Sequence, residues 1–101
     1  MTDTDGASGP LVFSACFPRR ESFASTAADL ASRLADSTGW KAGVAGEARA
    51  AVDAAFRETV ALERSDAETV DLLLRASDEA FSAQLTCGGV VVLRWLRTRV
   101  A

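Results

Sequence analysis

The chain has 101 residues, with 11 basic and 14 acidic side chains, no histidine and two cysteines. A chain of this length forms a single domain, and its 49% hydrophobic and 25% charged residues are typical of a globular protein. The lack of histidine excludes imidazole bases and histidine metal ligands, and the net charge of −3 argues against a nucleic-acid-binding module.

Residues 1–9 are polar and lack an apolar anchor, so we predict a disordered N-terminal tail followed by a single domain over residues 10–101. They also lack the basic and apolar segments of a signal peptide, and no apolar run reaches the roughly 20 residues that span a bilayer. These features predict a cytoplasmic protein without a membrane segment. In that setting both cysteines, Cys16 and Cys87, are expected to be reduced and buried.

Residues 11–17 alternate in a way that predicts a β-strand, which Pro18 ends because proline cannot donate to the ladder. Ser22 is a suitable N-cap for a following helix, and Gly39 is a suitable C-terminal cap. Apolar side chains recur at helical spacing from Phe23 onwards, which predicts an amphipathic helix. The face opposite to this apolar stripe is expected to be exposed and carries Ser25, Asp29, Ser32 and Asp36.

Gly43 and Gly46 then predict a loop. A second helix is expected from about Ala45 to Arg64, because apolar residues again recur at helical spacing. Its stripe consists of Ala48, Ala51, Val52, Ala55, Phe56, Thr59 and Val60. The many alanines permit close approach to another element, most simply a sheet.

Residues 69–76 and 81–87 alternate with a period of two, which predicts two further strands. Gly88 and Gly89 separate the second of these from residues 90–100, and a two-residue glycine connection is typical of a tight hairpin. The last segment begins with three valines and is predicted as a strand, although its spacing also permits a short helix. The order β-α-α-β-β-β predicts an α+β domain in which two helices pack on one face of a mainly antiparallel sheet.

The sequence offers little that indicates catalysis. No serine or cysteine has a histidine partner, and phosphate-binding glycine loops are absent. Carboxylates cluster near the end of the second helix, and we interpret them as a solvated acidic surface: Glu58, Glu63, Asp66, Glu68 and Asp71. We therefore expect no catalytic residue, no metal site and no cofactor, and the chain is favoured as a non-enzyme.

The segment Phe17–Phe23, followed by an alanine-rich helix, resembles the opening of the bacterial anti-sigma-factor serine kinases of the GHKL (histidine-kinase-like) ATPase superfamily. The resemblance covers residues 11–89. Residues 51–60 fall in the place of the family's Glu-x-x-x-Asn box, and residues 86–89 fall in the place of its Asp-x-Gly motif. The resemblance implies a GHKL-like fold, here without an ATP lid.

The chain departs from this family where the nucleotide would be bound. Ala54 stands in the place of the catalytic glutamate, Glu58 in that of the magnesium-binding asparagine, and Thr86 in that of the adenine-reading aspartate. Glu58, Gly88 and Gly89 are the weak candidates for cofactor contacts. The resemblance therefore implies a degenerate, non-catalytic regulatory domain that binds a protein partner, such as a sigma factor or an anti-anti-sigma factor, or binds itself.

Two alternatives stay open. One is a nucleotide-binding serine-kinase-like enzyme with an atypical site in which Glu58 binds the metal, and the other is an unrelated small-molecule-binding or structural domain. Leu73, Trp95 and Leu96 are candidate partner contacts, with core packing as the other interpretation. The β-branched residues 90–92 at a sheet edge predict a homodimer whose sheet continues across a two-fold axis.

Overall fold

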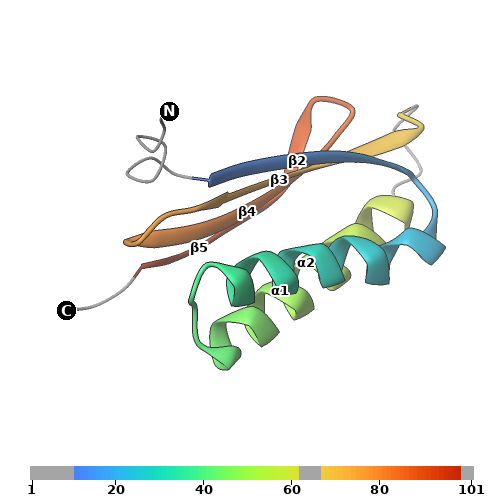
Figure 1. Cartoon of the computed structure of the whole chain (residues 1–101). Coiled ribbons are helices and arrows are strands. Elements are labelled where there is room, and N and C mark those ends of the chain that lie inside the picture. The colour runs from blue at the N-terminus through green and yellow to red at the C-terminus, as the bar shows by residue number, and fades with distance from the viewer. Residues whose placement is uncertain (1–10, 62–66, 99–101) are drawn as a thin grey trace.

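The computed structural model describes residues 11–61 and 67–98. In these residues two α-helices pack on one face of a four-stranded antiparallel sheet, which confirms the predicted element order and the α+β class (Figure 1). The strands are neighbours in the order β2-β3-β4-β5, so β2 and β5 form the two edges. The predicted tail, residues 1–9, lies outside the described residues.

The four strands follow the alternation in the sequence. They are β2 (Leu11–Pro18), β3 (Thr69–Ala76), β4 (Ala80–Cys87) and β5 (Val90–Thr98). In β3 and β4 every second side chain is buried in the core, as a sheet covered on one face requires. Gly88 and Gly89, with φ of 61° and 81°, connect β4 to β5 by a turn that suits glycine, which confirms the predicted hairpin and strand.

The first helix begins differently from the prediction. A 3-10 turn, Glu21–Phe23, precedes α1 (Ala24–Ser37), and Ser22 lies inside that turn. Neither the turn nor the helix has a side-chain cap. A backbone hydrogen bond forms there instead, because the Phe23 amide donates to the Arg20 carbonyl at 3.0 Å. The prediction that Ser22 caps the helix is therefore wrong.

The end of α1 is capped by Gly39, as predicted. Its φ of 86° turns the chain so that its amide donates to the Asp36 carbonyl at 3.2 Å. The amide of Trp40 donates to the Ala35 carbonyl at 3.0 Å, which completes a Schellman motif. This turn sends the chain directly into the next helix.

The second helix begins earlier than predicted. α2 spans Ala42–Ala61, so Gly43 and Gly46 lie in its first turns and the predicted loop is wrong. The amides of Val44 and Ala45 both donate to the Lys41 carbonyl, which starts the helix immediately after the turn. The predicted end of this helix, at residue 64, lies outside the described residues.

Small side chains let the helices pack closely on each other and on the sheet. The buried residues of α1 are Ala24, Ala27, Ala28, Ala31, Ser32 and Ala35. Ser32 is only 8% exposed, contrary to the prediction, because α1 is covered by α2 as well as by the sheet. Leu30 and Leu34, in contrast, are only half-buried, so the larger side chains of α1 point toward the margin of the core.

The two cysteines have different surroundings. Cys87 is buried, as predicted, but Cys16 is exposed because it alternates with Ala15 and Phe17, which face the helices. Neither cysteine forms a disulfide bond. Within residues 11–61 and 67–98, neither helix is long and apolar enough to cross a membrane.

Candidate functional site

The positions to which the sequence resemblance assigns a nucleotide site do not converge. Ala54 and Glu58 are exposed on α2. An ion pair of 2.6 Å between Arg97 and Glu47 joins the end of β5 to the start of α2, so Glu58 lies toward the same end of the sheet as the Gly88–Gly89 turn. Thr86, however, alternates with buried residues of β4 and therefore lies on the face of the sheet away from the helices.

Neither Glu58 nor the two glycines is part of a built site. The described residues contain no group of three or more cysteine or carboxylate side chains that could hold a metal ion. The positive φ angles of Gly88 and Gly89 are explained by the hairpin turn that they form.

The face of the sheet opposite to the helices is not covered by any described element (Figure 1). The register aligns its side chains in three rows across the strands, because directly paired residues point to the same side. From β2 to β5 the rows are Val12, Arg75, Ser82 and Leu96; Ser14, Leu73, Gln84 and Arg94; and Cys16, Asp71, Thr86 and Val91. We call this surface the open face.

A shallow cavity of about 460 Å³ lies on the open face over β3, β4 and β5. The register places Leu73 and Leu96 on one diagonal of it, with Gln84 and Ser82 between them on β4. Arginines occupy the other diagonal, since Arg75 lies in the row of Leu96 and Arg94 in the row of Leu73. The cavity therefore combines two apolar side chains with two cationic ones around the polar Ser82 and Gln84.

The arginines of the open face differ from those near the helices. Arg75 and Arg94 form no ion pair with any residue that the structure describes. Four arginines on the helix side are within 3.0 Å of a carboxylate, in the pairs Arg33–Asp29, Arg49–Asp29, Arg57–Glu21, Arg57–Asp53 and Arg97–Glu47. The one carboxylate in the three rows is Asp71, which lies in a separate row.

All three predicted contact residues line the cavity, although Trp95 faces the other side of the sheet from Leu73 and Leu96. Leu73 is half-buried and Leu96 is 55% exposed, and both line the cavity. Trp95 alternates with Leu96 and packs toward the core, with its ring 5.7 Å from that of Phe81 in an edge-to-face arrangement. The Arg97 guanidinium lies 5.2 Å from the centre of the Trp95 ring.

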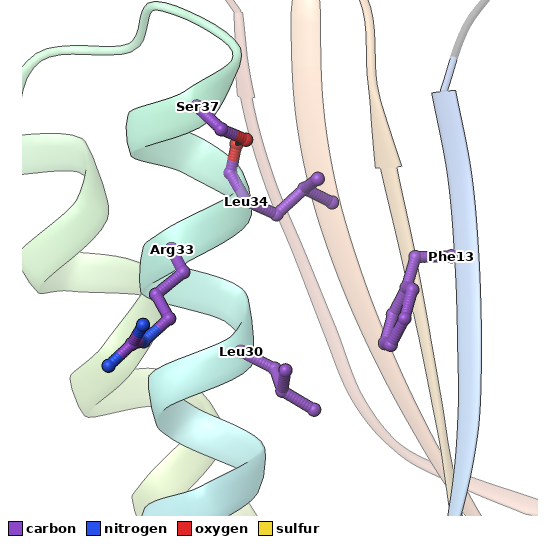
Figure 2. A pocket seen from close by; sticks show the side chains of 5 residues that line it. All are labelled: Phe13, Leu30, Arg33, Leu34 and Ser37. Atoms are coloured by element: carbon purple, nitrogen blue, oxygen red, sulfur yellow. Dashed lines mark hydrogen bonds between the residues drawn. The ribbon is translucent and has the colours of Figure 1, made fainter.

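A second surface feature lies between α1 and the edge strand β2. α1 packs mainly on α2 and β3, so the inner side of β2 is incompletely covered. An apolar groove of about 270 Å³ results, and Figure 2 shows Leu30 and Leu34 of α1 facing Phe13 of β2 across it. Arg33 and Ser37 form its margin. We call this the α1–β2 groove.

Ion pairs on the helix surface hold α1 in this position. The side-chain hydrogen bonds from Arg49 and then Arg33 keep the pKa of Asp29 below its ordinary value. Asp29 pairs with Arg33 within α1 at 2.6 Å, and its pair with Arg49 of α2 links the two helices at 2.8 Å. The hydrogen bond from Arg57 to Asp53 is the main reason that the pKa of Arg57 is raised.

Sequence reasoning missed both the arginine pair and the groove. Arg75 was visible as a charge that interrupts an apolar strand, but its neighbour Arg94 depends on the strand order, which periodicity does not encode. In the sequence, the only sign of the groove is that residues 11–18 carry no charge.

The chain matches no protein-family model, no curated protein and no solved structure.

Proposed function

We propose that this domain is a non-catalytic protein-interaction module, and that its open face binds an acidic, amphipathic helix of a protein partner. The observation that carries the proposal is the cavity in which two leucines lie on one diagonal and two arginines without a described ion pair lie on the other. Its leucines supply apolar contact area, and its arginines supply the preference for an acidic partner.

The chemistry of these side chains supports this class of partner. One face of an antiparallel sheet is commonly solvated and polar, whereas the open face carries four apolar residues: Val12, Leu73, Val91 and Leu96. The planar guanidinium of arginine binds a carboxylate through two parallel hydrogen bonds, and arginine is enriched in protein interfaces. The leucine diagonal crosses two strand spacings and two residues, about 12 Å, which is about two turns of a helix. A helix with apolar residues two turns apart, flanked by carboxylates, meets both the leucine diagonal and the arginine diagonal.

A nucleotide-dependent reaction is less well supported. Ala54 has no group that could activate a hydroxyl, and Glu58 and Thr86 lie on opposite sides of the sheet. The resemblance to the anti-sigma-factor kinases makes a sigma factor, or an anti-anti-sigma factor, the proposed kind of partner. A cytoplasmic setting is part of the proposal, because an exposed free thiol such as Cys16 persists in a reducing compartment.

The proposal is tested with a synthetic amphipathic helical peptide whose leucine stripe is flanked by glutamates, and with a second peptide in which lysines replace the glutamates. The acidic peptide is expected to bind and to shift the backbone amide signals of β3, β4 and β5, while the basic peptide does not bind. An Arg75→Glu variant is expected to weaken binding at least tenfold, because one charge-assisted pair becomes a repulsion.

The matched control is Arg20→Glu, which reverses the charge of an exposed arginine outside the open face. This variant is expected to bind the acidic peptide as the unmodified chain does. Equal losses in the two variants would indicate a general charge effect and would overturn the site. Heat released on calorimetric titration with magnesium and ATP would contradict the non-catalytic assignment.

A further inference from the structure

The two edges of the sheet differ in their protection against pairing with another strand. Natural edge strands are protected by charges and bulges. β5 carries Arg94 and Arg97, and its register with β4 shifts between Leu85 and Thr86. β2 has no charged residue over its eight positions and pairs with β3 without any register shift. Its protection is limited to Pro18, at its end.

Apolar side chains are exposed on both sides of the β2 edge. Leu11 and Phe13, on the side of the helices, are 51% and 37% exposed, although their position in the alternation assigns them to the core. Val12, on the open face, is 51% exposed. An uncharged strand edge therefore lies between two apolar strips, one of which continues into the α1–β2 groove.

We infer that β2 pairs antiparallel with β2 of a second copy of this chain, so that two four-stranded sheets become one. Two identical strands related by a two-fold axis satisfy each other's outward backbone groups, and each copy supplies the same apolar strip that it needs to cover. The edge has no charge that would select a different partner. This inference uses a different surface from the proposed partner site and does not depend on it.

The alternation of side chains restricts the geometry of this pairing. Directly opposed residues in an antiparallel pair point to the same side of the sheet. If the helices of both copies lie on the same side of the joined sheet, one residue of β2 must therefore lie directly opposite the same residue of the second copy, and the two-fold axis passes between these two. The two α1–β2 grooves then adjoin, and Leu11 and Phe13 of both copies lie between the two α1 helices.

The size of the contact indicates its strength. Eight paired residues extend over about 27 Å at the strand rise of ~3.4 Å. Such a strip, with the groove beside it, belongs to the class of small interfaces below the standard ~800 Å² per partner, which bind weakly or transiently. We therefore expect a dimer with a dissociation constant in the micromolar range, which forms and separates reversibly.

The test is a Val12→Lys substitution, with Val90→Lys as the matched control. Both positions are exposed edge valines, 51% on β2 and 62% on β5, so neither substitution is expected to disturb the fold of a single copy. Light scattering on a sizing column is measured from low to high micromolar concentration. The unmodified chain and Val90→Lys are expected to approach about 21 kDa, twice the chain mass of 10.6 kDa.

Val12→Lys is expected to raise the dissociation constant about 100-fold, because each copy loses an apolar side chain at the paired edge and gains an ammonium group there. A chain that stays at 10.6 kDa at the highest concentration would overturn the inference. A control variant that dissociates while Val12→Lys does not would assign the pairing to β5 instead. Assembly beyond two copies would require a head-to-tail contact, such as β2 on β5, and would also overturn the inference.

Hydrogen exchange of the unmodified chain gives an independent reading that needs no variant. Amides of residues 11–17 are expected to become more protected as the concentration rises, while those of residues 90–98 stay unchanged. Exchange that is independent of concentration in β2 would overturn the pairing even if the lysine variant fails to fold. The peptide test of the open face is unaffected by either result, so the two proposals can fail separately.

Discussion

Replacing Phe56 by alanine tests whether the core is built around α2. The Phe56 side chain is 0% exposed, and its ring meets that of Phe17 edge-to-face with centroids 6.0 Å apart. Removing a fully buried phenylalanine costs about 3–5 kcal/mol, a figure that contains both the transfer of the ring and the cavity left behind. Part of this cost is the aromatic contact, worth roughly 0.5–1.5 kcal/mol.

The expected loss for Phe56→Ala is about 4 kcal/mol, which is a large fraction of the roughly 5–15 kcal/mol that stabilises a domain of this size. The assay is urea unfolding followed by circular dichroism at low micromolar concentration, where dimer formation adds little stability. We expect the unfolding midpoint to fall while the slope with urea stays unchanged.

Phe13→Ala is the matched control, since the same atoms are removed from a ring that lies at the margin of the α1–β2 groove and is 37% exposed. Its cost is expected to be about 1–2 kcal/mol, because the ring keeps contact with water and leaves no closed cavity. Equal losses for the two variants would refute the reasoning, because Phe13 would then belong to the closed core and the groove would not be open.

Further predictions concern the glycines and the helix-side ion pairs. Gly46→Ala is expected to raise the free energy of unfolding by about 1 kcal/mol, since the residue lies inside α2 and an added Cβ would contact nothing within 4 Å. Gly89→Ala is expected to lower it by about 1 kcal/mol, because φ is 81° there. Chemical unfolding measures both, and the same sign for the two variants would contradict the backbone assignment. The pKa of Asp29 in the folded state is below its ordinary value of 3.8, mainly because of the hydrogen bond from Arg49 and then that from Arg33. The contribution of Asp29 to the stability of the fold is therefore present above pH 3.8 and is lost as the pH falls through the lower folded-state pKa. Asp29→Asn is therefore expected to flatten the stability curve at the acidic end, and an unchanged curve would show that the two helices do not depend on this pair.

Much of the fold could be predicted because its signals are local. The alternation in residues 69–76 and 81–87 has a period of two, and a half-buried strand has the same period. Gly88 and Gly89 specify a tight turn because they adopt positive φ at little cost. These features gave the strands, the hairpin and the α+β order.

The errors arose where burial depends on distant elements. Ser32 was expected to be exposed because it lies opposite the apolar stripe, but α2 covers that side of α1. Cys16 was expected to be buried because its neighbours are apolar, but it points to the uncovered side of an edge strand. Gly43 and Gly46 were expected to form a loop, and the turn at Gly39 starts the helix before them.

The same distinction applies to the candidate sites. Leu73 and Leu96 were identified from the sequence as apolar residues on an outer face, but only the strand order places them in one cavity with Arg75 and Arg94. Periodicity states which side of a strand a residue occupies, and it contains no information on which strand lies beside it. The charge of the cavity is therefore a property of the tertiary structure.

The sequence by itself determined that this chain of 101 residues, without histidine, has an α+β order of elements in which residues 69–76 and 81–87 alternate between an apolar and a more polar side. Only the tertiary structure decided which strands form the edges of the sheet and which of these edges the helices leave uncovered. Strands lie about 4.8 Å apart and packed helices about 8–10 Å apart, so the position of two helices on four strands is set by how closely their side chains approach. The small residues of α1 draw it against α2 and over β3, which leaves Phe13 and the rest of the uncharged β2 edge without a cover among residues 11–61 and 67–98.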